Sequence, residues 1–525
     1  MINLKSRDVQ NNRAPVFGRR AVVVSGHDTA SRAGIAALRD GGCIADALIA
    51  ASAALTVVLG HATSIGGDCF LLIHEAESGV TFGLNASGTA PSAATPDRFS
   101  KGIESHGPRT PVTPGLISGW DAIYRRFGRL QWRRLFDDAV ELAKGHSVSK
   151  VLVGQAARYR ERLAADPGCS NLYLPGGQPI TLGSCLKQPA LTETLKMVAA
   201  NGADGFYTGP IAKTLATFLQ ERGGLMQTTD LRAYTPLWVD PIWTEYRRHK
   251  VGVLPPNSYG LLLLMQLNGL EAIDGSAVNS DPVRRLKAQI SAMMAAMNLG
   301  AEYVADPKES VGVAERLLGA EITWAMRDAV RGSILGGRIR DQVGTACVLV
   351  ADSKGNAGCI VQSVFNVFGS GVLDPQTGVL FNNRMRGFDH HPGRPNTIGP
   401  GKRPAHTLCP VLVFKGNRPR YVLASPGGVS QTLINAQVLM NLIDGGSDVL
   451  SAVEAPRWAL NAAGDVIIEP AFPPDVAYDL ALAGYNVTRI EDDYFYGSAK
   501  GIEFLPDNAL AGGADSRREA AACGL

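Results

Sequence analysis

Two apolar segments joined by a short turn constrain the fold of this chain more than any other feature. Residues 346–351 and 357–365 are almost entirely apolar, and a Ser-Lys-Gly-Asn turn at 353–356 separates them. This pattern predicts a hairpin of two buried β-strands. Buried strands need other elements packed on them, so the chain is expected to fold in layers around a sheet.

The rest of the chain alternates strand and helix signals. Strands are expected at 20–25, 68–74, 411–415 and 420–424. Helical spacing of apolar residues appears at 29–40, 44–59, 132–144, 191–201 and 261–273. Residues 276–344 are mostly helical in pattern and end in a charged, glycine-rich loop over 331–344. Together these signals predict a mixed α/β protein with sheets inside and helices outside.

The charge balance argues against a nucleic-acid or membrane partner. The 525 residues include 51 Lys and Arg against 48 Asp and Glu, and no basic run interrupts the sequence. Such a chain lacks the electrostatic footprint of a protein that binds phosphate backbones or anionic lipids. The apolar segment 44–60 contains Asp46 and many alanines. It therefore predicts a packed helix and not a membrane span.

Cysteine and histidine spacing predicts no cofactor and no metal. The eight cysteines form no C-x-x-C pair, and the nine histidines form no H-x-x-x-H motif. His390 and His391 lie in a Pro- and Gly-rich loop and are more typical of a solvated loop than of metal ligands. The first twenty residues are polar and contain no apolar export segment. We expect a cytoplasmic protein, since free thiols fit a reducing compartment.

Thr345 is the first candidate for chemistry. It lies between the glycine-containing loop and the first residue of a buried strand, a place where threonine also has an ordinary structural role. A cut between Gly344 and Thr345 would give Thr345 a free α-amine beside its hydroxyl. An α-amine with a pKa near 7.7–8.0 accepts the hydroxyl proton close to neutral pH, so one residue would supply both nucleophile and base. In the uncut chain that base is absent.

An acyl-transfer site also needs donors for the oxyanion that develops during attack. Gly427 and Gly428 follow Pro426 and precede a segment with helical apolar spacing. Their N–H groups, together with the helix N-terminus, can point at a substrate. The same turn is equally typical of an ordinary connection from strand to helix.

An ordered set of motifs resembles the γ-glutamyltranspeptidase family of N-terminal-nucleophile hydrolases. The set includes Gly-Gly-Cys-Ile-Ala-Asp-Ala at 41–47, Thr-Pro-Gly at 113–115, Gly-Phe-Tyr-Thr-Gly at 205–209, Asn-Asn-Arg-Met at 382–385, Ser-Pro-Gly-Gly at 425–428 and Gly-Gly-Ala-Asp-Ser-Arg-Arg at 512–518. The resemblance implies a four-layer αββα sandwich and a proenzyme that cuts itself before a threonine nucleophile.

The resemblance also implies the roles of particular residues. Carried over, the nucleophile is Thr345 and the cleavage site lies between Gly344 and Thr345. A large chain of residues 1–344 and a small chain of residues 345–525 would form one intertwined folding unit, as a heterodimer or a dimer of heterodimers. Ser363 matches the family's second hydroxyl residue, which supports the nucleophile. Gly427 and Gly428 match its oxyanion-hole glycines.

The substrate-binding positions depart from the family. Ser87 stands at the place of the arginine that holds the γ-glutamyl group, and Gly387 stands at the amine-binding aspartate. Phe365 replaces an asparagine, which would make the pocket smaller and less polar, and His406-Thr407 replaces a pair of serines. A zwitterionic amino acid would thus lose two charge-assisted bonds of roughly 1.5–3 kcal/mol each.

Three functions follow as alternatives. The first is a self-processing amidohydrolase that converts a small, oxamate-like carboxylate amide to the acid and ammonia through an acyl-enzyme on Thr345; the oxamate amidohydrolase branch of the family is similar in these respects. Arg384 and His406 would bind its carboxylate. The second is a γ-glutamyl hydrolase or transferase acting on glutathione-type substrates, or a side-chain acylase. The third is a non-catalytic relative in which Thr345 is only a strand residue. The departures from the family at the substrate-binding positions favour the first function, the amidohydrolase.

Overall fold

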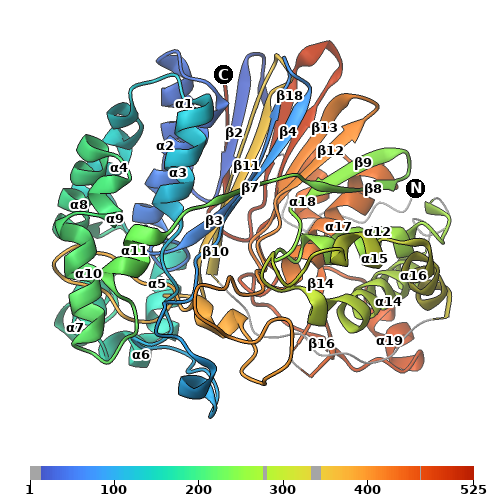
Figure 1. The fold of residues 1–525 in the computed structure, drawn as a ribbon. Coiled ribbons are helices and arrows are strands. Elements are labelled where there is room, and N and C mark those ends of the chain that lie inside the picture. The colour runs from blue at the N-terminus through green and yellow to red at the C-terminus, as the bar shows by residue number, and fades with distance from the viewer. Residues whose placement is uncertain (1–12, 276–280, 333–343, 462) are drawn as a thin grey trace.

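Two seven-stranded antiparallel sheets stack face to face at the centre of the molecule, and helices cover the outer face of each (Figure 1). The computed structural model describes residues 13–275, 281–332, 344–461 and 463–525. The loop expected at 331–344 therefore falls mostly outside the described residues. The order of layers is helix, sheet, sheet, helix, which confirms the four-layer αββα fold.

Each sheet places strands from distant parts of the chain next to one another. The first sheet has the order β1 (Val16–Gly18), β18 (Leu510–Ala514), β17 (Lys500–Phe504), β13 (Arg418–Ala424), β12 (Val411–Lys415), β9 (His249–Val253), β8 (Ile242–Tyr246). The second sheet has the order β19 (Ala521–Gly524), β2 (Ala21–Ser25), β10 (Gly344–Asp352), β11 (Ala357–Phe365), β3 (Asp68–Glu75), β4 (Val80–Ala86), β7 (Leu237–Val239).

Both sheets mix strands from before and after residue 344. In the second sheet, β10 and β11 lie between β2 and β3. In the first sheet, β12 is bonded to β9, and β18 is bonded to β1. A cut between Gly344 and Thr345 would therefore leave two chains that share both sheets, because the hydrogen-bonded ladders cross from one segment to the other.

The helices fall into two outer layers (Figure 1). Those on the side of the second sheet are α1 (Asp28–Arg39), α2 (Ile44–Val58), α3 (Leu116–Phe127), α4 (Asp137–Lys144), α5 (Lys150–Arg158), α6 (Arg160–Ala164), α7 (Pro167–Tyr173), α8 (Pro189–Asn201), α9 (Asp204–Tyr207), α10 (Pro210–Gln220) and α11 (Thr228–Ala233). Those on the side of the first sheet are α12 (Gly260–Leu270), α14 (Pro282–Gly300), α15 (Val313–Leu317), α16 (Ala320–Gly332), α17 (Ser430–Ile443), α18 (Val449–Glu454) and α19 (Pro474–Leu482).

Two smaller sheets complete the described secondary structure. They comprise β14 (Trp458–Leu460), β15 (Val466–Ile468) and β16 (Val487–Arg489), and the pair β5 (His146–Ser147) and β6 (Cys185–Leu186).

Strand alternation explains why the hairpin is buried on both faces. Val348 and Val350 of β10 belong to the apolar cluster that contacts the helices. Cys347 and Leu349, on the opposite face, belong to the cluster between the two sheets. Successive side chains of a strand point to opposite faces, so an uninterrupted apolar run fits a strand with protein on both sides. The hairpin prediction is confirmed, with β10 and β11 antiparallel.

The apolar segment at 44–60 forms the packed helix α2. All of its residues are buried, including Asp46. Asp46 accepts hydrogen bonds from the backbone N–H of Cys43 (2.8 Å) and of Arg129 (3.1 Å), which stabilises the N-terminus of α2 and satisfies the buried carboxylate. Within the part of the chain that the structure describes, no helix is long and apolar enough to cross a membrane.

The other expected elements are present, with one break. The helix expected at 132–144 is a 3-10 turn, Trp132–Phe136, followed by α4. Leu135 and Phe136 at the junction are buried in the core that contains α2.

Candidate active site

Thr345 lies at an irregular point of the central hairpin. Gly344 pairs with Phe365 and Ala346 pairs with Gln362, so the register shifts at Thr345. Such a bulge bends the strand and re-orients the side chain at that point. The Thr345 side chain is buried, with 3% of its surface exposed.

Ser363 contacts the peptide group that precedes Thr345. Its hydroxyl donates a hydrogen bond of 2.5 Å to the carbonyl oxygen of Gly344. The backbone N–H of Phe365 donates to the same hydroxyl at 2.7 Å and fixes its orientation. Ser363 is thus aimed at the carbonyl that the Thr345 hydroxyl would have to attack in a self-cleavage reaction.

The turn at Gly427 and Gly428 joins β13 to α17. Gly427 has φ +146° and Gly428 has φ +60°, values that L side chains rarely adopt. Their carbonyl oxygens accept from the backbone of Ser430 and Gln431, which starts α17. Among the described residues, neither glycine N–H has a hydrogen-bond acceptor in the chain. Both donors are therefore available to an oxyanion.

Gln431 links this turn to Thr345. Its side-chain amide nitrogen lies 3.5 Å from Thr345 Oγ1, and its amide oxygen accepts from the backbone of Cys409 at 3.1 Å. Gln431 is fully buried. Sequence reasoning missed this residue, although its place four residues after Gly427, in the first turn of the expected helix, was a usable signal.

A buried ion cluster lies one strand away from Ser363. Asp68 begins β3 and pairs in register with Ser363 of β11. The Arg384 guanidinium donates to both carboxylate oxygens of Asp68, at 2.9 and 3.2 Å, and His406 Nε2 lies 2.9 Å from Oδ2. All three side chains are completely buried. A Cβ on Gly67 would lie 2.4 Å from the Ser363 carbonyl, so glycine is needed for the close approach that puts Asp68 here.

The cluster carries no net charge near neutral pH. Burial would raise the pKa of Asp68, but the Arg384 charge and the hydrogen bonds from Arg384 and His406 outweigh it and hold that pKa well below its usual value. Burial, together with the Arg384 charge, lowers the pKa of His406 to about 4. His406 is therefore neutral at pH 7 and donates through Nε2, while its Nδ1 accepts from the backbone of Leu408.

Two buried donors beside this cluster have no partner in the described part of the chain. They are Arg384 Nη1 and Thr407 Oγ1. The Arg384 guanidinium also lies 4.6 Å from the centre of the Phe365 ring, and Phe365 adopts φ +78°. The structure thus brings together Phe365, Arg384 and His406, with Thr407 next to His406 in the chain, but the charge of Arg384 is already neutralised by Asp68, which the sequence had not indicated.

Ser87 lies close to the same cluster with its hydroxyl already engaged. Ser87 Oγ donates to Asn85 at 2.7 Å and accepts from Asn257 at 3.2 Å. The neighbouring Gly88 N–H donates to Asp68 at 3.4 Å. Ser87 therefore lies next to the cluster, but its hydroxyl is already bonded within the protein and offers no free polar group.

The described residues include one group with the spacing of metal ligands, formed by Asp389, His390 and His391. It lies in the loop that the sequence placed at the surface. The Asp389 carboxylate is held by His391 Nδ1 at 2.7 Å and by Arg394 at 2.8 Å. These bonds account for the carboxylate without a metal.

Comparisons with known proteins identify the family of this chain. The family model for gamma-glutamyltranspeptidase matches residues 30–525. The chain belongs to this family. It is 30% identical to the glutathione hydrolase-like YwrD proenzyme of Bacillus subtilis, over 97% of this chain and 99% of that protein. It is also 30% identical to the oxamate amidohydrolase proenzyme of Klebsiella pneumoniae, over 96% and 98% of the two chains.

Among solved structures, the cephalosporin acylase of Bacillus halodurans superposes with a TM-score of 0.91 at 30% identity, covering 100% of this chain and 99% of that one. Matching members of this family include hydrolase proenzymes and acylases. The chain is accordingly an enzyme of the amidohydrolase and acylase kind within the γ-glutamyltranspeptidase family.

Proposed function

We propose that this member of the family cuts itself between Gly344 and Thr345 and then hydrolyses the amide of a small, oxamate-like carboxylate. The 2.5 Å hydrogen bond from Ser363 to the Gly344 carbonyl supports the cleavage. A donor at that oxygen polarises the carbonyl and stabilises the negative charge that forms when the Thr345 hydroxyl attacks it. The two products, residues 1–344 and 345–525, would stay together as a heterodimer because their strands share both sheets.

In the turnover reaction, the new α-amine of Thr345 accepts the proton of its own hydroxyl, and Oγ1 attacks the amide carbon of the substrate. The N–H groups of Gly427 and Gly428 stabilise the oxyanion. The C–N bond then breaks, the proton returns to the leaving nitrogen, and ammonia departs. Water hydrolyses the ester on Thr345, which releases the acid and restores the hydroxyl. No step calls for a cofactor or a metal.

The buried ion cluster favours a substrate that has a carboxylate and no α-amine. Arg384 Nη1 and Thr407 Oγ1 are the two donors left to bind a carboxylate. An ammonium group would need an acceptor, but both oxygens of Asp68 are taken by Arg384, and Oδ2 is also bonded to His406. Because the cluster has no spare negative charge, it would leave an α-ammonium buried and unsatisfied, at a cost of a few kcal/mol.

Phe365 and Ser87 add to this selectivity. The Phe365 ring presents an apolar surface beside Arg384. The Ser87 hydroxyl is bonded within the protein, so it offers no cation and no free donor to a second carboxylate. A compact acid with one carboxylate fits this site better than a γ-glutamyl compound with two charged groups at one carbon.

The rate of ammonia release from oxamate, compared with the rate of aniline release from a chromogenic γ-glutamyl anilide, tests this proposal. We expect faster turnover of oxamate, and Arg384→Gln should raise KM for oxamate because it removes the free donor. Faster turnover of the anilide would show that the reading of Ser87, Phe365 and Asp68 is wrong. Turnover of neither, by protein that is correctly cut, would leave the carboxylate proposal without support.

A side-chain acylase is the second candidate, because the cephalosporin acylase covers the whole chain with a TM-score of 0.91. Such an enzyme would release an acid from an N-acylated amine while using the same nucleophile. Acid release from an N-glutaryl amine that exceeds ammonia release from oxamate would favour this function.

We place the enzyme in the cytoplasm. All eight cysteines are free thiols, and five of them are buried. A chain that keeps this many thiols unpaired is typical of a reducing compartment.

A further inference from the structure

The self-cleavage step lacks the base that serves later turnover. Before the cut, the nitrogen of Thr345 is part of an amide, and an amide nitrogen does not accept a proton near neutral pH. Some other group must take the proton of the Thr345 hydroxyl when it attacks the Gly344 carbonyl. This inference rests on the proposed cleavage between Gly344 and Thr345.

A small cavity of about 20 Å³ borders Thr345. It has room for one water molecule. Its lining includes Thr345 and Ala346 of β10, Pro426 before the glycine turn, and Ser498 and Lys500 from the other sheet. Lys500 pairs with Ala424, the last residue of β13, so it lies directly beside the strand that leads into the turn at Gly427.

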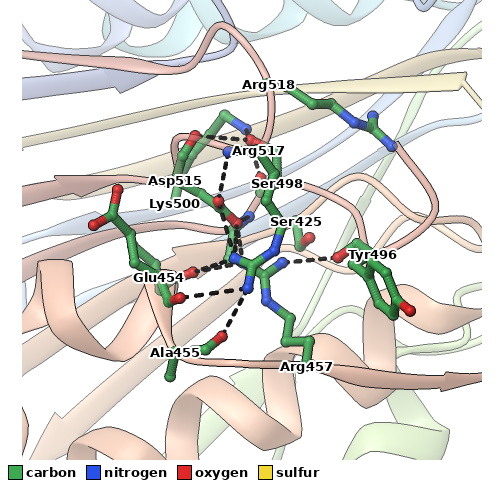
Figure 2. Close-up of polar contacts among 12 residues, drawn as sticks. Ser425, Glu454, Ala455, Arg457, Tyr496, Ser498, Lys500, Asp515, Arg517 and Arg518 are labelled. Atoms are coloured by element: carbon green, nitrogen blue, oxygen red, sulfur yellow. Dashed lines mark hydrogen bonds and ion pairs between the residues drawn. The ribbon is translucent and has the colours of Figure 1, made fainter. Parts of the chain in front are cut away.

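Lys500 is a buried lysine whose amine is bonded to no carboxylate among the described residues. Its side chain is 2% exposed. Nζ donates to the carbonyl oxygen of Ser498 at 2.7 Å and lies 3.3 Å from the Ser498 hydroxyl (Figure 2). Neither partner is charged. A buried ammonium that lacks a carboxylate is costly, so this environment favours the neutral amine, which is a base.

The carboxylates of Asp515 and Glu469 are bonded to arginines and not to Lys500. Asp515 is bonded to Arg457 and Arg517 (Figure 2). Arg517 also binds Glu469. Asp515 Oδ2 accepts in addition from the backbone N–H of Ala499 at 3.0 Å, between Ser498 and Lys500. This network therefore fixes the backbone of the Lys500 segment while providing Lys500 with no counter-charge.

We propose that Lys500, in its neutral form, is the base that accepts the Thr345 hydroxyl proton during self-cleavage. The Thr345 Oγ–H bond breaks and its proton passes to Lys500 Nζ through at most one water molecule, while Oγ1 bonds to the Gly344 carbonyl carbon. The Ser363 hydroxyl stabilises the oxyanion. The bond from Gly344 to the Thr345 nitrogen then breaks, Lys500 returns the proton to that nitrogen, and water hydrolyses the resulting ester to give the Gly344 carboxylate.

The other groups facing Lys500 are unsuited to this role. Burial raises the pKa of the Cys347 thiol to about 11 and lowers the pKa of His61 to about 3, so both are neutral and neither is a useful base at pH 7. Arg518 is a cation that contributes to lowering the pKa of Lys500. Glu519 lines the same cavity; one of its oxygens accepts from the backbone of Val151, and Oε2 is buried with no hydrogen-bond partner among the described residues. A carboxylate is ordinarily a much weaker base than an amine, so Lys500 is the better acceptor for a hydroxyl proton. Cys359 and Arg457 also lie close enough to act on the charge of Lys500.

The electrostatics agree with the geometry. Burial, reinforced by the charges of Arg518 and Arg457, lowers the pKa of Lys500 to about 8. A useful fraction of the side chain is then neutral at physiological pH, whereas an ordinary lysine, with a pKa near 10.4, is almost entirely protonated. General bases work best when their pKa lies near the working pH.

The test follows the conversion of freshly translated chain into its two pieces, by denaturing electrophoresis and intact mass, at a series of pH values. For the wild-type chain we expect the rate to rise about tenfold per pH unit below pH 8 and to level off above it. We expect Lys500→Met to slow conversion by about 100-fold or more, the contribution of a general base. Lys500→Arg should be equally slow, since it keeps the charge but cannot accept a proton.

Rescue and control variants separate a base from a structural role. Methylamine added to uncut Lys500→Met protein should restore cleavage in proportion to the free-amine concentration, whereas guanidinium should not. Lys354→Met, which changes an exposed lysine in the turn between β10 and β11, should convert at the wild-type rate. Thermal unfolding of each variant checks that it is folded.

Three results would overturn the role of Lys500. They are a wild-type cleavage rate that does not change between pH 6 and 9, cleavage of Lys500→Met at the wild-type rate, and cleavage of Lys500→Arg at the wild-type rate. The first of these needs no variant to fold. Each leaves cleavage at Thr345 intact, whereas a wild-type chain that never converts would contradict the proposed function itself.

Discussion

The hydroxyl of Ser363 lies 2.5 Å from the carbonyl oxygen of Gly344, the residue that immediately precedes Thr345. This contact joins the two strands of the central hairpin at the point where their register shifts. It gives the peptide bond before Thr345 a hydrogen-bond donor while the chain is still uncut. The uncut fold is therefore already arranged to stabilise the charge of an attack on Gly344.

Ser363→Ala should slow self-cleavage without unfolding the protein. Removing one donor to a developing oxyanion typically costs about 10²–10³ in rate. The measurement is the half-life of the uncut chain, with thermal unfolding as the check on folding. Ser363→Thr keeps a hydroxyl and should cleave faster than Ser363→Ala. Equal half-lives for wild type and Ser363→Ala would remove Ser363 from the mechanism.

Asp68 and Arg384 should depend on one another for stability. Arg384→Met leaves a buried carboxylate without its cation, and loss of one partner of a buried pair costs about 3–5 kcal/mol. The double variant Asp68→Asn/Arg384→Met should recover part of this loss, because no bare charge remains. Urea unfolding of the two single variants and the double variant measures the coupling. If the loss of unfolding free energy in the double variant equals the sum of the losses in the two single variants, Asp68 and Arg384 are not coupled.

Gly387→Asp should fail to create γ-glutamyl activity, although it restores the residue type that the family uses there. A Cβ at this position would lie 2.7 Å from the Ala405 carbonyl oxygen and 2.9 Å from Pro404 Cβ. The backbone would have to move, so we expect a lower melting temperature and no hydrolysis of a γ-glutamyl anilide. An active, equally stable Gly387→Asp variant would contradict this account of substrate selectivity.

Stability should fall as the pH drops from about 6.5 to about 4. Burial lowers the pKa of His406 to about 4, so over this range the unfolded chain takes up a proton that the folded chain does not. For one histidine, this difference in proton uptake corresponds to a loss of about 3 kcal/mol in the free energy of unfolding. Asp68, whose folded pKa is also lowered, adds to the loss only below about pH 3.8. Urea unfolding at pH 7 and pH 4.5 should show a smaller difference for His406→Gln than for the wild type.

Local sequence patterns were sufficient to predict the framework. The strand at 357–365 was expected with the observed bounds, and α1, α2 and α8 begin and end within two residues of the expected positions. These elements depend on apolar spacing and on turn residues that lie next to them in the chain. The helix expected at 132–144 begins with a 3-10 turn, which the apolar spacing alone does not distinguish from an α-helix.

The site was predictable only in part. Thr345, Ser363, Gly427 and Gly428 stood out through the family motifs, but the partner of Arg384 did not. Asp68 precedes Arg384 by 316 residues, and only the pairing of β3 with β11 brings Asp68 beside this part of the site. Lys500 begins a strand that also contains Glu503 and glycine, so no local pattern singled it out. Its environment comes from the opposite sheet, which is why the sequence alone did not assign it.

The most direct test is the mass and N-terminal sequence of the purified, active protein. We expect two pieces, with Thr345 as the first residue of the smaller one, and a Thr345→Ala variant that stays uncut and inactive. An active preparation in which the bond between Gly344 and Thr345 is intact would contradict the account, because the nucleophile would then lack its base.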